Sequence, residues 1–319
     1  MRTFRREKKM LILKLHGGLG DQLYMFFSAA ALAHSASRSL VLCKWTIDQT
    51  HAGSPFGLLD LVSQDIPLEL TQSSSNKIFM SFHKYITGIL RGRLSEASFF
   101  RLKIYLDRFF GIINNVSSFN YDLAESGFVE RELEILKWRR RVQLDCYFPT
   151  VSGFESLKLK TTLPGLSKNP VGHSVALSEG YAVAHFRVGD IFDTYTSRGV
   201  LTSDYFQSCI QMILEIDPRV VVYGVSDNIE RAKALYPNLP LLWIDESDEF
   251  DALEILRLLS NSRFLIAANS GLSLWAGRLG SSIEKVYAPL YLDRQDLSLN
   301  TSHKPLDENW ELVANEFIS

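Results

Sequence analysis

Cysteine is scarce in this sequence of 319 residues. Cys43, Cys146 and Cys209 are an odd set, far apart and in no spacing typical of metal ligands. Such a set cannot build a disulfide framework or a zinc site, which argues for a reducing compartment. We interpret each cysteine as a small core residue.

Long apolar runs and an excess of charge of one sign are also missing. The apolar run after the basic N-terminus, from Met10 to Leu15, is interrupted by Lys14. It is too short for the apolar region of a signal peptide or for a transmembrane helix. The formal net charge of −2 creates no general field for polyanions, which disfavours nucleic acid as a partner. We expect a cytoplasmic protein that holds any anion in a local site.

The composition that remains is that of a soluble globular protein. Hydrophobic residues make up 46 % of the chain and charged residues 22 %, which excludes a mainly disordered chain. The length suits two domains of roughly 100–200 residues each. Residues 161–174 are rich in Pro, Gly, Ser and Asn and predict a linker, so we expect domains at 1–165 and 166–319.

Strand and helix patterns alternate in both halves of the chain. Residues 10–45 are typical of a strand, a glycine-rich turn, an Ala-rich helix and a second strand. In the second half the predicted strands are 181–186, 220–223, 241–244, 264–267 and 286–288, with helices at 203–214, 228–235, 250–259 and 272–279. Short connections between them favour parallel sheets covered on both faces. The fold class that we predict is α/β, with two facing Rossmann-like domains as in GT-B glycosyltransferases.

Residues 77–113 interrupt the pattern of the first half. They are rich in aromatic residues and carry seven Lys or Arg against two acidic residues. We predict a helical insertion with a basic face. That face is either simply solvated or makes a peripheral contact with the inner face of the membrane, which would suit a lipid-linked acceptor.

A glycine-rich turn follows the first predicted strand. Gly17, Gly18 and Gly20 would let the backbone approach a ligand, and the helix N-terminus behind them offers N–H groups to an anion. A plain tight turn is the alternative. The spacing G-G-x-G differs from the G-x-G-x-x-G of dinucleotide-binding proteins, and no ribose-binding acid follows about 20 residues later, which disfavours a nicotinamide enzyme.

Polar side chains follow three predicted strands of the second half. They are His185, Arg187 and Asp190 at the end of the first strand, Ser226 and Asp227 after the second, and Asn269, Ser270 and Ser273 after a third, where Gly271 makes the turn compact. Sheets of this class hold ligands at the carboxyl ends of their strands. Together with the glycine loop facing it from the first half, the set predicts a nucleotide-diphosphate site in an interdomain cleft. Arg187 could bind a diphosphate through two nitrogens while Asp190 orients it. A structural ion pair, helix caps at Ser226 and Asp227, and a core histidine at His185 are the alternatives.

These segments, in this order, resemble the bacterial α-1,2-fucosyltransferase family, whose donor is GDP-fucose. The family's G-G-L-G-N-Q loop is matched by GGLGDQ at 17–22, and its H-x-R-R-x-D element by HFRVGD at 185–190. Its S-D-D strand end resembles VSDNIERAKAL at 225–235, and its A-N-S-x-F-S-W-W element resembles ANSGLSLWAG at 268–277. The resemblance covers about residues 10–292, except the region around 60–135.

The resemblance implies an inverting glycosyltransferase that moves L-fucose from GDP-fucose to the 2-hydroxyl of a galactose-type acceptor, in a surface glycan such as O-antigen. The first domain would take the acceptor and the second the nucleotide sugar. The implied binding residues are Gly17, Gly18, Gly20, Gln22, His185, Arg187, Ser226, Asp227, Asn269, Ser270 and Ser273. No cofactor is expected, and no D-x-D metal motif follows a strand, which favours a metal-independent reaction.

The sequence departs from the family at four places. Asp21 replaces Asn, Val188 replaces the second Arg, Leu274 replaces the first Trp, and Ile255 stands where an acid is usual. Glu254 beside Ile255 could still accept hydrogen bonds from guanine.

Two of these departures affect the chemistry that we expect. Asp21 is the first candidate for the general base, followed by Asp190 and Asp193. Val188 removes a charge, which leaves open a transferase that uses another nucleotide sugar. A non-catalytic protein that binds a nucleotide sugar or a glycan is the alternative from another class.

Overall fold

The computed structural model describes residues 9–13, 15, 17–43, 68–71, 116–119, 141–144, 180–189, 191, 198–244, 251–294 and 308–318. For 68–71, 116–119 and 141–144 the description is of the backbone alone. Within these residues no helix combines the length and the apolar character needed to cross a bilayer. The chain divides into two compact units, and each unit contains one sheet.

The first unit contains a five-stranded parallel sheet in the order β3-β2-β1-β5-β4. Its elements are β1 (Met10–Leu13), α1 (Leu19–Ser35), β2 (Ser39–Cys43), β3 (Leu68–Thr71), β4 (Val116–Phe119) and β5 (Arg141–Leu144). Ala and Leu, which favour helix, fill much of α1, and this helix packs against β1 and β2. The chain enters at β1, so the turn from β1 into α1 lies at the carboxyl edge of the central strand.

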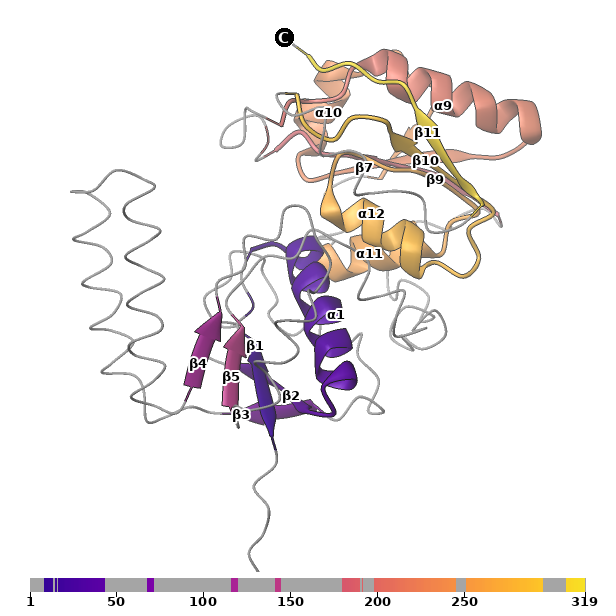
Figure 1. Ribbon diagram of the computed structural model, residues 1–319. Coiled ribbons are helices and arrows are strands. Elements are labelled where there is room, and N and C mark those ends of the chain that lie inside the picture. The colour runs from indigo at the N-terminus through magenta and orange to yellow at the C-terminus, as the bar shows by residue number, and fades with distance from the viewer. Residues whose placement is uncertain are drawn as a thin grey trace, which may run out of the picture. The chain divides into compact units, whose positions relative to one another are not determined.

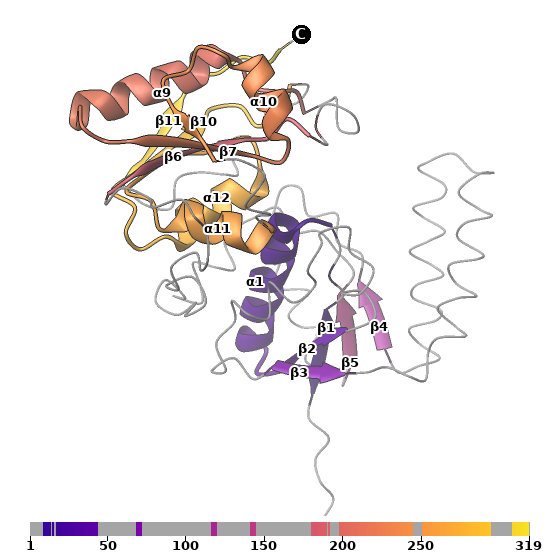
Figure 2. The same cartoon turned by 180° about the vertical axis from the view of Figure 1, so that it is seen from behind.

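The second unit contains a six-stranded parallel sheet in the order β11-β10-β9-β6-β7-β8. Its elements are β6 (Ala182–Phe186), α9 (Ser203–Ile216), β7 (Val222–Ser226), α10 (Ile229–Leu235), β8 (Leu242–Trp243), α11 (Ala252–Ser260), β9 (Phe264–Ile266), α12 (Gly271–Leu279), β10 (Lys285–Pro289) and β11 (Trp310–Val313). Helices α9 and α10 cover one face of this sheet, and α11 and α12 cover the other (Figures 1 and 2).

Aromatic packing fixes the face of the second sheet that α9 and α10 cover. The Phe186 ring lies 4.1 Å from Phe206 of α9, 5.0 Å from Tyr236 and 4.7 Å from Trp243, measured between centroids. Ala182 and Ala184 belong to the same buried cluster, since alternate residues of a strand point to one face. His185 and Val183 therefore point to the opposite face, toward α11 and α12.

The strand and helix pattern predicted for the second half is confirmed element by element, with ends that shift by at most three residues. One strand was missed, β11, whose sequence WELV carries an acid in a four-residue run. The strands β3, β4 and β5 were not predicted either. The predicted domain boundary at 165, the helical insertion at 77–113, Asp190 and Asp193 lie outside the described residues.

Candidate functional site

The order of strands in the second sheet marks one position for a ligand. The chain begins this sheet at β6, proceeds to β7 and β8 on one side, and then crosses to β9 on the other side of β6. The connections after β6 and β9 therefore leave in opposite directions, and the carboxyl ends of two such strands are where sheets of this class bind ligands. Arg187 follows β6 directly, and Asn269 and Ser270 follow β9.

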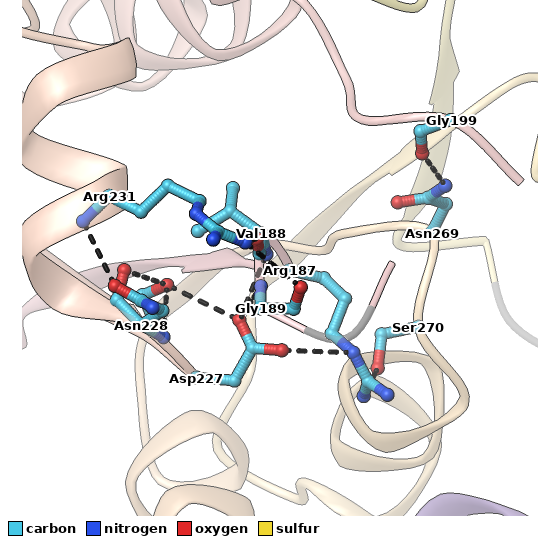
Figure 3. Close-up of polar contacts among 10 residues, drawn as sticks. Arg187, Val188, Gly189, Gly199, Asp227, Asn228, Arg231, Asn269 and Ser270 are labelled. Atoms are coloured by element: carbon cyan, nitrogen blue, oxygen red, sulfur yellow. Dashed lines mark hydrogen bonds and ion pairs between the residues drawn. The ribbon is translucent and has the colours of Figure 1, made fainter. Parts of the chain in front are cut away.

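Arg187 is held at this position by residues from the strands on both sides. Its Nε lies 3.2 Å from Oδ2 of Asp227, which follows β7, and its Nη1 donates to Oγ of Ser270 at 3.4 Å (Figure 3). The two side chains of the ion pair are 29 % and 28 % exposed, so the pair lies at the surface of the unit and a solute can reach it. The structure thus brings together three predicted site residues from three separate segments.

The turn after Arg187 is fixed through its backbone amides, which the Asp227 side chain binds. Asp227 Oδ1 accepts from the amides of both Val188 and Gly189, each at 2.9 Å. A β-carbon on Gly189 would lie 2.8 Å from Asp227 Oδ2, so this approach requires glycine. Val188 itself is buried in the core cluster, so its side chain adds no charge and no donor at the edge of the sheet.

A side chain in the first turn of α10 also contacts this turn. Arg231 Nη1 donates to the carbonyl oxygens of Val188, at 3.1 Å, and of Gly189, at 3.2 Å. Sequence reasoning missed Arg231. The available signal was a cation in the first turn of a helix, where the helix dipole disfavours positive charge.

The cap of α10 comes from neither Ser226 nor Asp227. Asn228 occupies the N-cap position, and its side chain accepts from the amide of Arg231 at 3.0 Å. The Ser226 hydroxyl interacts with the Asn228 backbone instead. Asp227 therefore contacts both the turn and Arg187. Asp190, which the sequence predicted to orient Arg187, lies outside the described residues.

The polar residues after β9 differ in how they are used. Asn269 Nδ2 donates to the carbonyl oxygens of Gly199, Arg198 and Leu292, and therefore ties two loops to the end of β9. The buried Ser273 hydroxyl donates back to Ala268 and Ser270. Ser270 is the N-cap of α12, makes no side-chain cap bond and meets Arg187 instead. The amides in the first turn of any α-helix have no hydrogen-bond partner within that helix. In this segment the first-turn amides of α12 are therefore the groups available to an anion.

His185 is a buried neutral residue in the structure. It is 2 % exposed, and its Nδ1 finds no hydrogen-bond partner among the residues that the structure describes. Burial, reinforced by the positive charge of Arg187, lowers its pKa to about 3. An uncharged imidazole does not compete with Arg187 for an anion.

The glycine turn of the first unit is closed by its own side chains. Gly17 has a φ of +76°, which favours glycine, and a β-carbon there would lie 2.7 Å from Asp21 Oδ2. Gln22 is buried, and its Nε2 donates to the Gly17 carbonyl oxygen at 3.1 Å. Gly18 is the exposed N-cap of α1, and Gly20 lies buried in the first turn. Asp21 and the backbone of this turn are therefore the groups placed at the N-terminus of α1.

Glu254 lies in the first turn of α11 and forms a capping box with Asp251. Its Oε2 accepts from the Asp251 amide at 3.2 Å, while Asp251 Oδ1 accepts from the Glu254 amide at 2.8 Å. A guanine base would have to share this carboxylate with the helix.

Over the described part of the chain, no group of three or more His, Cys, Asp or Glu side chains is placed to hold an ion.

Comparison with known proteins gives structural neighbours but no relatives by sequence. No protein-family model matches the chain, and no curated protein matches its sequence. A mutant of FUT1 from Arabidopsis thaliana, in complex with GDP, superposes with a TM-score of 0.51 at 15 % identity, over 91 % of this chain and 72 % of that chain. Fucosyltransferase NodZ from Bradyrhizobium superposes with a TM-score of 0.47 at 13 % identity, over 88 % of this chain and 95 % of that chain. The E. coli heptosyltransferase WaaC with ADP superposes with a TM-score of 0.44 at 11 % identity, over 96 % of this chain and 92 % of that chain.

The likeness to FUT1 extends over nine-tenths of this chain, and it agrees with the two parallel sheets in separate units. The predicted fold class is therefore confirmed, and the chain has a GT-B-type glycosyltransferase fold.

Proposed function

We propose that the protein is an inverting glycosyltransferase that transfers L-fucose from GDP-fucose to the 2-hydroxyl of a galactose-type acceptor. The acceptor belongs to a surface glycan such as O-antigen, assembled at the cytoplasmic side of the membrane. The observation that carries the proposal is the position of Arg187, where Asp227 and Ser270 hold its guanidinium at the switch point of the sheet. This is the place at which α/β sheets bind nucleotides.

The chemistry requires a stabilised leaving group. The acceptor oxygen bonds to the anomeric carbon of fucose while the bond from that carbon to the diphosphate oxygen breaks, so negative charge develops on the departing GDP. The guanidinium of Arg187 and the first-turn amides of α12 would stabilise that charge. Because this cation is part of the chain, the proposed reaction needs no divalent metal ion.

The acceptor hydroxyl must also lose a proton. Asp21, at the N-terminus of α1, is our candidate base, with Asp190 and Asp193 behind it. Its carboxylate would take the hydroxyl proton as the oxygen attacks from the face opposite the diphosphate, which inverts the anomeric centre.

Guanine nucleotide as the leaving group is supported from two directions. FUT1 of Arabidopsis thaliana, a protein of the same fold, is described in complex with GDP. The four ordered motifs of the bacterial α-1,2-fucosyltransferase family point to the same donor.

The buried Val188 favours a second candidate, a transferase of this fold that uses another nucleotide sugar. Arg187 is then the one arginine of the 185–190 segment, and a single guanidinium can bind the diphosphate of any nucleotide sugar. Thermal-shift measurements with GDP-fucose, GDP-mannose and UDP-sugars separate the two candidates. Stabilisation by a UDP-sugar alone would reject fucose.

The direct test is mass spectrometry after incubation with GDP-fucose and a panel of galactosides, with and without EDTA. We expect a product heavier by one deoxyhexose in both conditions, and loss of the product in Arg187→Ala. Arg219→Ala removes an exposed arginine before the amino end of β7 and is the matched control. Donor binding without transfer or donor hydrolysis would instead indicate a non-catalytic binding protein. Activity that EDTA abolishes and Mg²⁺ restores would contradict the metal-free mechanism.

A further inference from the structure

The two peptide groups after Arg187 are held from both sides by side chains at the start of α10, Asp227 just before the helix and Arg231 in its first turn. Asp227 accepts from the amides of Val188 and Gly189, and Arg231, four residues later, donates to the carbonyl oxygens of the same two residues. Figure 3 shows Asp227, Arg231 and the turn between them, with Arg187 extending from this turn toward Ser270.

The position of Arg231 carries an electrostatic disadvantage, which its contacts with the turn help to offset. It lies in the first turn of α10, where the positive end of the helix dipole opposes a cation. Each terminal nitrogen of a guanidinium carries two N–H groups, so Nη1 can donate to two neighbouring carbonyl oxygens. Charged donors form stronger hydrogen bonds than neutral ones. The contact to the turn therefore fixes the turn more firmly than a neutral side chain could.

The turn matters because it sets the direction in which Arg187 leaves the sheet. Asp227 holds the amide side of the turn and also the Nε of Arg187, whereas Arg231 holds the carbonyl side among the residues that the structure describes. Without Arg231 the two carbonyl oxygens would lose their charged donor, and the contacts of Asp227 with the amide side of the turn would remain. Arg231 also brings a second positive charge to the segment in which Val188 supplies none.

We propose that Arg231 is a positioning residue for the donor diphosphate, acting through the Val188–Gly189 turn that carries Arg187. This inference rests on the proposed function. It differs from it in that a nucleotide could bind at Arg187 without any help from α10.

The test is calorimetric binding of GDP to the full chain, with Arg231→Met and Arg231→Lys compared with the wild type. Met keeps an unbranched stem without donors, and we expect it to weaken GDP binding about ten- to hundredfold. The Lys ammonium carries three donors on one nitrogen and can donate to both carbonyl oxygens as Nη1 does, so we expect it to restore binding to within about threefold of the wild type. Lys233→Met, on the same helix, is the control for net charge and should bind as the wild type does.

The outcomes separate the two proposals. If the wild type binds neither GDP nor any other nucleoside diphosphate, the proposed function fails. If the wild type binds GDP and Arg231→Met binds it equally well, or if the Lys variant is as weak as the Met variant, the role of Arg231 is overturned. Should Arg231→Met not fold, Arg231→Gln takes its place, and wild-type affinity in that uncharged variant would overturn the role as well.

Discussion

Acidification should destabilise the protein through His185. Burial and the neighbouring Arg187 lower the pKa of this imidazole to about 3 in the folded chain, from an ordinary value of 6.5. Between these two values the unfolded chain binds a proton that the folded chain does not, so the free energy of unfolding falls as the pH falls. Above pH 6.5 both states are neutral and the contribution is constant. Each pH unit within the window costs about 1.4 kcal/mol, which gives about 2 kcal/mol at a pH of about 5.

The assay is urea unfolding of the wild type and of His185→Gln at about pH 7.5 and about pH 5. Other titrating groups are common to both proteins, so the difference between their pH dependences isolates His185. We expect the wild type to lose about 2 kcal/mol more than the variant over this range. Equal losses would refute the buried neutral imidazole and return His185 to the residues that could meet a charged ligand.

Three further substitutions probe the site in kinetic assays. Asp227→Asn removes the charge paired with Arg187 but keeps an acceptor for the turn, and we expect kcat/KM to fall about ten- to hundredfold with little change in Tm; unchanged kinetics would show that the ion pair does not orient Arg187. Gly189→Ala places a β-carbon 2.8 Å from Asp227 Oδ2, and weaker GDP binding by calorimetry is the expected result; wild-type affinity would mean that the turn adjusts freely. Asp21→Asn should lower kcat about 10²- to 10⁴-fold with donor affinity retained if Asp21 is the base, and a drop below about tenfold would reject that role.

The sheet of the second unit could be predicted because most of its strands and helices have a recognisable local sequence pattern. Apolar runs such as the one that ends at Phe186 alternate with amphipathic helices such as α9, whose buried residues repeat at helical spacing. The strand β11 escaped because its sequence, WELV, carries a charge in a short run, and it is recognised only by its pairing with β10. Local pattern identifies an element when the burial of its residues follows from its own periodicity.

The proximity of three candidate residues could be predicted from the sequence, but the hydrogen-bond partners of the other candidates could not. Parallel topology places the residues after β6, β7 and β9 at one edge, which was enough to gather Arg187, Asp227 and Ser270. The hydrogen bonds that decide each role join residues far apart in sequence, such as Asn269 with Gly199, and no spacing rule reveals them. The sequence predicted that Asn269 binds phosphate, and in the structure its side-chain amide donates to backbone carbonyl oxygens of two loops. Arg231 was passed over for the same reason.

The central claim is that Arg187 binds the diphosphate of the donor, and calorimetric titration with GDP and with guanosine tests it most directly. Arg187→Ala should weaken the binding of GDP by roughly 30- to several thousandfold, the range expected when one partner of a charged contact is lost. Guanosine, which has no phosphate, should bind the wild type and the variant equally. Equal affinity of the two proteins for GDP, with the variant folded as judged by its Tm, would contradict the claim.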